Sequence, residues 1–350
     1  RTSAFSKPLT LTGNSTKSCW EWTDFYMKHR EYMQLGFPKL RDVSGRSTIA
    51  DLYPNKTQRT GIYLLAFPEG DYYAGQSVDV VRRFAEHLKA KGAISGFSFM
   101  PVRESELDEV ERFCVNSLQH RCRLRNIELV ASPQVETDFD TVIARNVQEN
   151  WLKTGLLRPV HYKRNSDKVL WNELQARYHD RAAKLLTDSC FCQYALPVMR
   201  KYMLYGIPEP FMTELSFWSC SCVPKSTREI VIFSRINLRS CEVFTVGYHK
   251  VAKEPFYSFH LARSVFEKNY NDGYFLHQYP SAEIYNHIYR SAGLDQCNVI
   301  FSDFNEVMAA LENPAFLYAV KFFNLGQMRR GAHLYYHTHC IELAEAILPV

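Results

Sequence analysis

The spacing of apolar positions changes from that of strands to that of a helix between residues 60 and 90. Two short apolar runs, at 62–67 and 72–74, flank residues 68–71, whose sequence Pro-Glu-Gly-Asp is typical of a turn. This segment therefore predicts a β-hairpin. A helix is expected next, with Ser77 or Asp79 as its N-cap, because apolar side chains then recur at helical spacing, at Val80, Val81, Phe84 and Leu88.

A second helix is predicted over residues 107–118. Two glutamates of this segment, Glu109 and Glu111, point about 200° apart on a helix, so only one of them can face a neighbouring cleft. Glu111 lies beside the expected apolar stripe and is the favoured of the two. The stripe is expected to consist of Val110, Phe113, Cys114 and Leu118.

Two tyrosine motifs lie in the hairpin, and charged side chains follow them. The motifs are Gly61-Ile62-Tyr63 and Tyr73-Ala74-Gly75, and the predicted helix then carries Arg83 and His87 four residues apart. This ordered set resembles the GIY-YIG nuclease family over roughly residues 58 to 130, although Ala74 replaces the branched apolar residue usual in the second motif. In the family a glutamate follows on a later helix, where Glu111 and Glu109 compete for the position, and some members add an asparagine, for which the candidate is Asn126.

The resemblance implies a metal-dependent hydrolase of phosphodiester bonds, with Mg²⁺ or Mn²⁺ held by Glu111. Either Tyr63 or Tyr73 would act as the base, and the sequence does not choose between them. Arg83 would contact the transferring phosphoryl group, and His87 would orient a tyrosine or contact the scissile phosphate.

The residue types suit this chemistry. A hard divalent cation prefers carboxylate oxygens and leaves much of its shell to water and phosphate, so few protein carboxylates are needed. An arginine guanidinium keeps its charge and forks onto two phosphate oxygens. A tyrosine hydroxyl, which titrates near about 10, accepts a proton when a neighbouring cation favours the phenolate.

The predicted fold class is α/β (α+β), with a small sheet flanked by helices and a second mixed α/β domain. Residues 1–57 are expected to form an N-terminal extension with a linker at 45–60, and residues 58–130 the nuclease-like domain. A connecting helix is expected within 131–154, and residues 155–350 form a recognition or regulatory domain. Aromatic residues of the extension are expected to pack on the nuclease-like domain, namely Trp20, Trp22, Phe25, Tyr26 and Tyr32.

The C-terminal half alternates helical and extended patterns. It contains no glycine-rich phosphate loop, which argues against a nucleotide-driven motor. The connecting helix before it is expected to run from residue 139 to 154. Further helices are expected at 171–186, 256–270 and 304–311, and strands at 229–233, 241–246 and 298–301.

Composition indicates a globular protein that is mildly basic. Of the 350 residues 46% are hydrophobic and 23% are charged, and the formal net charge is +5, which is compatible with nucleic acid. Basic residues concentrate over 151–184 and at Arg121, Arg123 and Arg125. With Arg82, these three arginines are candidates for contacts to the DNA backbone, although such runs also occur on solvated helix surfaces.

The sequence also bears on location. No apolar run reaches the roughly 18 residues that a membrane span needs, and no secretory signal is visible. The chain begins at Arg1 rather than Met, which leaves a processed or truncated N-terminus open. Its 10 cysteines are expected to be reduced, because a chain of this size does not need disulfide staples. We therefore expect a cytoplasmic protein.

Cysteine pairs and a histidine cluster raise the question of zinc. Four thiolates are available from Cys190 and Cys192 together with Cys220 and Cys222. One intervening residue is instead typical of alternate positions on a strand, where cysteine packs as a small hydrophobe. The second cluster is disfavoured as a metal site because no carboxylate lies within it, and it comprises His333, His337, His339 and Cys340.

These observations lead to one functional hypothesis and one alternative. The first is a metal-dependent DNA endonuclease, in restriction or defence against foreign DNA, with repair and mobile-element cleavage left open. Its C-terminal domain would recognise a DNA site, a modification, a DNA structure, a protein or a small ligand. The alternative is a nucleic-acid-binding protein, including one directed to RNA, that keeps the nuclease fold without turnover.

Overall fold

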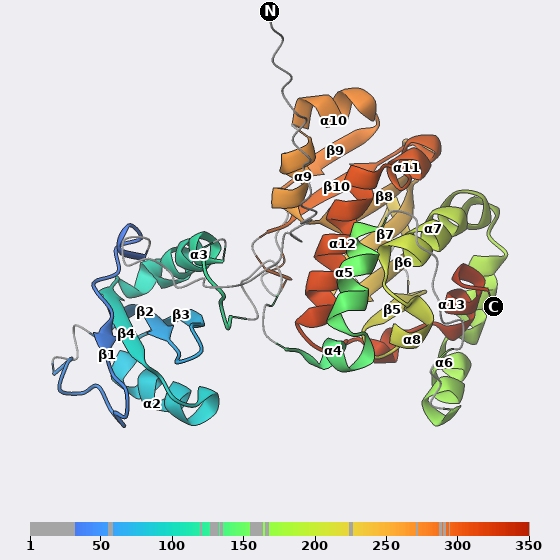
Figure 1. Cartoon of the computed structure of the whole chain (residues 1–350). Helices are drawn as coiled ribbons and strands as arrows, with labels where there is room; N and C mark the ends of the chain where they lie inside the picture. The colour runs from blue at the N-terminus through green and yellow to red at the C-terminus, as the bar shows by residue number, and fades with distance from the viewer. Residues whose placement is uncertain are drawn as a thin grey trace, which may run out of the picture.

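The computed structural model describes residues 32–54, 59–119, 121–126, 133, 136–154, 164, 168–223, 227–270, 272–286, 289, 292–293 and 295–349. They form two bodies, each built around its own antiparallel sheet (Figure 1). We call residues 32–126 the N-terminal body and residues 136–349 the C-terminal body. The fold class is mixed α/β, as predicted.

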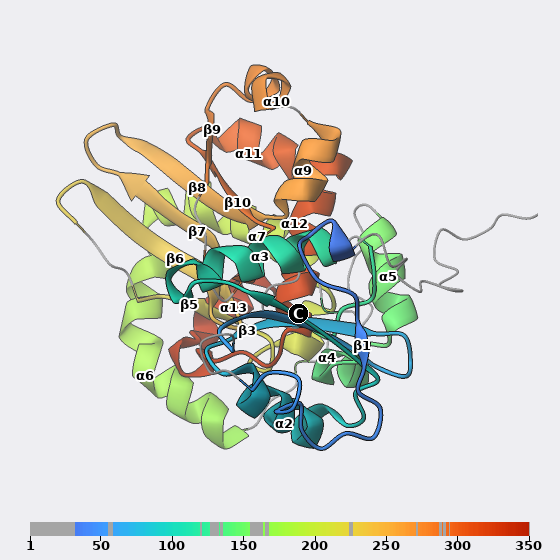
Figure 2. The ribbon, with the colours of Figure 1, turned by 90° about the vertical axis from the view of Figure 1, so that its left-hand side faces the viewer.

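The N-terminal body has a sheet of four strands in the order β1-β4-β2-β3. Helices α2 (Val80–Lys91) and α3 (Leu107–Leu118) lie on opposite faces of this sheet (Figure 2). A short 3₁₀ helix, η2 (Glu104–Glu106), precedes α3. The strands are β1 (Arg41–Asp42), β2 (Gly61–Ala66), β3 (Tyr72–Ser77) and β4 (Gly96–Pro101).

The predicted hairpin and first helix are confirmed. Strands β2 and β3 pair in antiparallel register across the turn at 67–71. Asp79 caps α2, because its Oδ1 accepts from the backbone N–H of Val81 at 3.1 Å and of Arg82 at 3.4 Å. Ser77 acts one step earlier, where its hydroxyl accepts from the Asp79 N–H at 3.0 Å.

Strand β2 is buried on both faces. Ile62 and Leu64 pack with α3 on one side of the sheet, and Tyr63 and Leu65 pack with α2 on the other. Because side chains of a strand alternate between faces, a single six-residue strand contributes to two separate cores.

The described part of the segment predicted as extension and linker, residues 32–54, belongs to the N-terminal body. Tyr32 is buried beside α3, and β1 pairs with β4. The described residues 45–54 do not form a free linker, because Ile49 is fully buried and Leu52 and Tyr53 pack against the same core. Burial of these apolar side chains outweighs the polar composition that suggested a linker. Trp20, Trp22, Phe25 and Tyr26 lie outside the described residues.

The apolar stripe of α3 differs from the predicted one at one position. Phe113 is 60% exposed, whereas Leu107 and Val115 are buried together with the expected Cys114 and Leu118. The buried stripe is thus rotated by about one position along the helix relative to the prediction. Glu111 consequently lies at the border of the buried face, and Glu109 is exposed.

The C-terminal body has a six-stranded sheet in the order β5-β6-β7-β8-β10-β9. The predicted strands at 229–233, 241–246 and 298–301 are confirmed within β6, β7 and β10. The strands are β5 (Trp218–Ser221), β6 (Ile230–Leu238), β7 (Cys241–His249), β8 (Glu254–Leu261), β9 (Ala282–Tyr285) and β10 (Cys297–Phe301).

Helix α12 (Pro314–Arg329) is the most deeply buried helix of the C-terminal body among those described. Its Phe316 contacts Phe259 of β8 edge to face, with ring centroids 5.5 Å apart. The other helices are α6 (Lys168–Leu186), α7 (Leu196–Gly206), α8 (Pro210–Thr213), α9 (Arg263–Asn269), α10 (Asp272–Gln278), α11 (Phe304–Ala310) and α13 (Ile341–Ile347), with a π-helical turn η3 (Phe191–Ala195) and a 3₁₀ turn η5 (Tyr336–Thr338).

Two helix predictions for this half are corrected. The expected connecting helix at 139–154 is two helices, α4 (Asp138–Val142) and α5 (Arg145–Lys153), interrupted where Ile143 and Ala144 have extended backbone angles. Both helices pack into the C-terminal core through Phe139 and Trp151. The expected helix at 256–270 is strand β8 up to Leu261 and helix α9 from Arg263, because β8 pairs with strands on both sides.

Among the helices of the described residues, none combines the length and the apolar character that crossing a membrane requires.

The two sides of α3 give a test of this packing. Leu118→Ala should lower the free energy of unfolding by about 2–5 kcal/mol, because the side chain is fully buried and truncation leaves a cavity. Phe113→Ala, on the same helix, should change it by less than about 0.5 kcal/mol, because the ring is 60% exposed. Urea titrations would measure both, and equal losses would contradict the rotated stripe.

Candidate functional site

Four predicted side chains meet on the α2 side of the N-terminal sheet. Tyr63 of β2 lies at the centre, with its Oη 2.6 Å from Nε2 of His87. The Nε of Arg83 donates to the same hydroxyl at 3.4 Å. The ring of Tyr73, on β3, lies beside both, with its centroid 4.8 Å from that of His87 and 6.2 Å from that of Tyr63.

Gly75 leaves the space that the Tyr63 side chain occupies. The two residues are directly opposite each other in the β2–β3 ladder. A Cβ on Gly75 would lie 2.4 Å from Tyr63 Oη and 2.7 Å from its Cζ. The glycine of the second tyrosine motif therefore has a steric role, since any side chain there would push the Tyr63 hydroxyl away from Arg83 and His87.

Burial keeps the central groups of the site uncharged. The pKa of His87 is lowered to about 4, chiefly by burial and in addition by the positive charges of Arg83 and Lys91. Burial also raises the pKa of Tyr63 and of Tyr73, and the nearby Arg83 opposes this shift at both tyrosines. At neutral pH the site therefore presents a neutral imidazole and two phenols.

Arg83 provides the fixed positive charge. Its Nη1 donates to Oε2 of Glu86 at 2.8 Å, and this hydrogen bond is the main reason that its pKa is raised. The side chain of Arg83 is 43% exposed, so the guanidinium remains accessible from solvent. An incoming anion would compete with Glu86 for it.

The structure separates the two candidate glutamates. Glu111 accepts a hydrogen bond from Nε2 of Gln76 at 3.0 Å, whereas Glu109 is exposed on another side of α3. Burial raises the pKa of Glu111 and the Gln76 hydrogen bond opposes the shift. The negative charge of Glu111 in turn raises the pKa of both Tyr63 and Tyr73. Glu111 is thus the glutamate whose charge acts on the tyrosines, although its helix α3 packs on the other face of the sheet from Tyr63.

Gln76 and Asp108 were not predicted as site residues. The amide nitrogen of Gln76 donates to Oδ1 of Asp108 at 2.7 Å as well as to Glu111, which brings two carboxylates around one donor. Lys91 was also missed, and its Nζ lies 4.4 Å from the ring centroid of Tyr73. Helical spacing could have indicated both charged residues, since Asp108 precedes Glu111 by three positions and Lys91 follows His87 by four.

The oxygen donors at this point fit a hard divalent cation. Among the described residues no group of three or more His, Cys, Asp or Glu side chains is placed to hold a metal. A cation at Glu111, with Asp108 nearby, would therefore take most of its shell from water and substrate oxygens, as Mg²⁺ commonly does.

Asn126 does not contact the tyrosines or Arg83 in any described interaction. Its side chain pairs with the backbone of Ala74 instead, accepting from the N–H at 3.1 Å and donating to the carbonyl at 2.7 Å. Because Asn126 is buried and used at both ends of its amide, it positions β3 rather than offering a group to a substrate.

The predicted DNA-contacting arginines differ in how they are used. Arg125 is held by Glu69 at 2.7 Å and by Asp71 at 3.1 Å, and its guanidinium lies over Phe67. Arg123 pairs with Asp71 at 3.4 Å and is half-exposed. Arg82 is 71% exposed and lies 3.8 Å from Glu86. Arg121 is partly exposed and also has interactions within the body.

The cysteine and histidine clusters of the C-terminal body serve its packing. Cys220 and Cys222 are buried in the core, and Cys190 and Cys192 lie in and beside the π-helical turn rather than on a strand. The histidines are bound by neighbours, since His333 lies 2.7 Å from the Ser219 hydroxyl and His339 lies 3.1 Å from Glu214.

Comparison with known proteins adds no assignment. No protein-family model, curated protein or solved structure matches this chain.

The buried neutral His87 makes stability depend on pH. The unfolded chain takes up the proton near 6.5 and the folded chain near about 4, so this contribution is complete above pH 6.5 and is lost as the pH falls toward 4. Over that interval the free energy of unfolding should fall by up to about 3 kcal/mol through His87 alone.

Urea titrations of the full chain across this pH interval, followed by a signal from the N-terminal body, would measure the effect. His87→Gln should remove this component, and His337→Gln, at an exposed position in the C-terminal body, serves as the control. A loss of stability in the His87→Gln variant as steep as in the wild type would contradict the assignment.

Proposed function

We propose that the protein is a metal-dependent DNA endonuclease whose active site is formed by Tyr63, Tyr73, Arg83, His87 and Glu111. The observation that carries the proposal is the contact of Tyr63 Oη with both His87 and Arg83. The charge of Glu111 also acts on Tyr63. Side chains from two strands and one helix, named by the nuclease resemblance, lie together. Unrelated packing would not require a buried phenol to be joined to both an imidazole and a guanidinium.

Proton movement is assigned to Tyr63 and His87. The imidazole is neutral at pH 7, and in the tautomer that leaves Nε2 unprotonated this atom, 2.6 Å from Tyr63 Oη, can accept the phenolic proton. As that proton moves, Tyr63 Oη becomes able to take one from an attacking water. Tyr73 stands beside this pair and is the alternative base, since its hydroxyl also interacts with Tyr63 and Arg83.

Charge stabilisation is assigned to Arg83. Its guanidinium is anchored at Tyr63 on one side and at Glu86 on the other, with the latter contact open to solvent. A phosphoryl group that gains negative charge in the transition state would draw the same donors toward it. Arg82, one residue earlier and largely exposed, is the DNA-backbone candidate of the helix.

Glu111 would hold the cation, with Asp108 as a second oxygen donor. When bound, a divalent cation neutralises charge on the phosphate and the leaving oxygen. Gln76 donates to both carboxylates and would have to turn away from the metal position. The Gln76 amide donates a hydrogen bond to each of the two carboxylates at the position proposed for the cation.

The substrate choice and location belong to the same proposal. DNA is favoured over RNA by the resemblance alone, and restriction of foreign DNA is the role we propose. The C-terminal body would select the target. A cytoplasmic location agrees with free thiols at all cysteines in the described part of the chain.

Plasmid nicking in the presence of Mg²⁺ tests the activity. Arg83→Ala should lower the cleavage rate by about 10²–10³-fold, because a preorganised donor to the phosphoryl group is removed. Glu111→Ala should abolish cleavage and leave DNA binding intact, while Glu109→Ala, on the same helix but exposed, should cleave normally. Chelation should stop the wild type.

Several results would count against the proposal. If Arg83→Ala and the wild type behave alike, with no metal-dependent nicking of plasmid, single-stranded DNA or RNA, the nuclease proposal fails. Retained binding of DNA or RNA would then favour the alternative, a nucleic-acid-binding protein without turnover. Cleavage of RNA alone would change the proposed substrate from DNA to RNA and leave the proposed reaction, phosphodiester hydrolysis, unchanged. If Glu109→Ala lost cleavage while Glu111→Ala cleaved normally, Glu109 would replace Glu111 as the proposed metal ligand.

Single hydroxyl deletions distinguish the two tyrosines. Tyr63→Phe should reduce the cleavage rate by at least about 10²-fold, because it breaks the hydroxyl contacts to His87 and Arg83. Tyr73→Phe keeps the ring stacked on Tyr63 and should have the smaller effect. Single-turnover rates measured across pH would check this, and a larger loss in Tyr73→Phe would make Tyr73 the base.

A further inference from the structure

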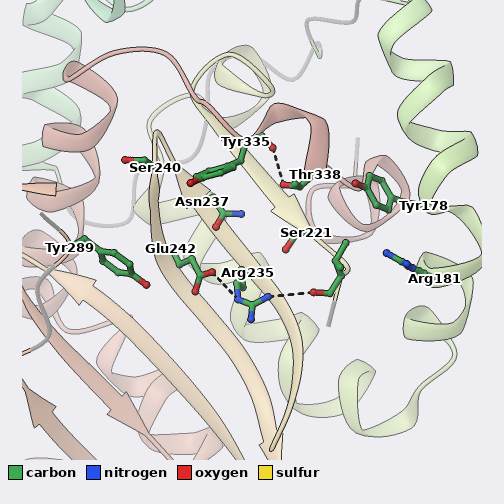
Figure 3. A pocket seen from close by; sticks show the side chains of 11 residues that line it. Tyr178, Arg181, Ser221, Arg235, Asn237, Ser240, Glu242, Tyr289, Tyr335 and Thr338 are labelled. Carbon is green, nitrogen blue, oxygen red and sulfur yellow. Dashed lines mark hydrogen bonds and ion pairs between the residues drawn. The ribbon is translucent and has the colours of Figure 1, made fainter. Parts of the chain in front are cut away.

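The C-terminal body contains an open pocket of about 750 Å³ at one end of its sheet (Figure 3). Strands β5, β6 and β7 form one wall, and α6 and the η5 turn form the others. The volume lies within the range of small-molecule sites in proteins. No residue of the nuclease-like site lines it.

The strand register places polar side chains next to one another on the wall of the pocket formed by β5, β6 and β7. Ser221 of β5 lies directly opposite Arg235 of β6, and Asn237 of β6 lies opposite Glu242 of β7. Because side chains alternate along a strand, the intervening Ile236 is buried in the core on the other face. The same sheet therefore has an apolar face toward the helices and a polar face toward the pocket.

Two polar side chains of this wall are largely buried and line the pocket. Asn237 is only 7% exposed and Ser221 only 6%. Asn237 Nδ2 reaches the Ser219 hydroxyl at a long 3.5 Å, and neither Asn237 Oδ1 nor Ser221 Oγ has a hydrogen-bond partner within the described residues. Because both side chains line the pocket, their free hydrogen-bonding capacity is available to a ligand or to water there.

A fixed charge pair completes the wall. Arg235 Nε lies 3.1 Å from Glu242 Oε1, and Arg235 Nη1 donates to the Val223 carbonyl at 3.3 Å. The side chain of Arg235 is 14% exposed and that of Glu242 is 46% exposed, so the carboxylate is the more accessible of the two. The wall thus offers an amide, a hydroxyl and a carboxylate at rigid positions.

The opposite walls add flat surfaces and a cation. Tyr335 and Tyr178 both line the pocket (Figure 3), and the Tyr178 hydroxyl is fixed by a 2.9 Å hydrogen bond to the carbonyl of His337. Arg181 follows Tyr178 on α6 and is exposed at the pocket rim. Aromatic rings provide stacking surfaces for heterocycles, and an exposed guanidinium suits a phosphate.

We propose that this pocket binds a nucleobase together with its sugar phosphate. Asn237 would read the base edge, since a carboxamide offers a donor and an acceptor side by side, as base edges do. Ser221 and Glu242 supply further polar contacts, tyrosine supplies stacking, and Arg181 meets the phosphate. The source is a free nucleotide or a base turned out of DNA, and only the second source depends on the nuclease proposal above.

Binding of free deoxynucleoside monophosphates tests the pocket directly. Titration calorimetry of the full chain with each of the four should give saturable binding by at least one. Asn237→Leu and Ser221→Ala should each weaken it at least about tenfold, because a ligand group loses its partner. Asn269→Leu, an equivalent change at an exposed position of α9, should not alter it. Melting curves confirm that the variants fold.

A second arm tests the DNA source in the Glu111→Ala background, in which cleavage is expected to be lost and DNA binding kept. The probe is a duplex with one 2-aminopurine in a mismatched pair, where unstacking is easiest. Binding should raise the 2-aminopurine fluorescence, and Asn237→Leu should abolish the rise while duplex affinity changes little. This result assigns the base to DNA, whereas binding of free nucleotides without a fluorescence rise assigns a free ligand.

The proposal is overturned if neither probe binds, or if both bind equally well in Asn237→Leu, Ser221→Ala and the wild type. Its failure is separable from failure of the nuclease proposal. Metal-dependent nicking, without nucleotide binding that depends on Asn237 and Ser221, would contradict only the pocket proposal. Nucleotide binding that is weakened by Asn237→Leu, in a protein that does not nick DNA, would contradict only the nuclease proposal.

Discussion

The N-terminal body depends on burial of strand β2 from both sides. Ile62 and Leu64 hold α3, and Tyr63 and Leu65 hold α2, so one strand fixes the distance between two helices that never share a core. The candidate site exploits this arrangement, because α2 carries Arg83 and His87 and α3 carries Glu111. Any loss of register in β2 would exchange the two faces and separate the groups.

Much of this site could be predicted from the sequence, since its signals are local. The hairpin turn, the Asp79 cap and the four-residue spacing of Arg83 and His87 all lie within a short segment. The preference for Glu111 over Glu109 also follows from the sequence, because Glu111 lies beside an apolar stripe. The stripe itself was misplaced at Phe113, because helical periodicity alone does not tell which neighbouring positions tertiary packing will cover.

The errors concern partners that are distant in sequence. Nothing near Arg125 indicates that Asp71 and Glu69, more than fifty positions earlier, bind its guanidinium. In the same way, the strand at 256–261 resembles a helix until its pairing with β7 and β10 is known. The polar wall at Arg235 and Asn237 likewise needed the register of three strands, although its alternation with Ile236 is visible in the sequence.

The pairing of Asn126 with Ala74 also affects how the molecule behaves toward its own copies. Strand β3 ends the sheet, and an uncovered edge strand is a template for intermolecular pairing. The segment around Leu124 runs along that edge, bonding to Tyr72 through the backbone of Arg123 and Arg125 and to Ala74 through Asn126. The edge that carries Tyr73 is thereby closed to strand addition at these positions, which guards against aggregation at the strand where chemistry is proposed.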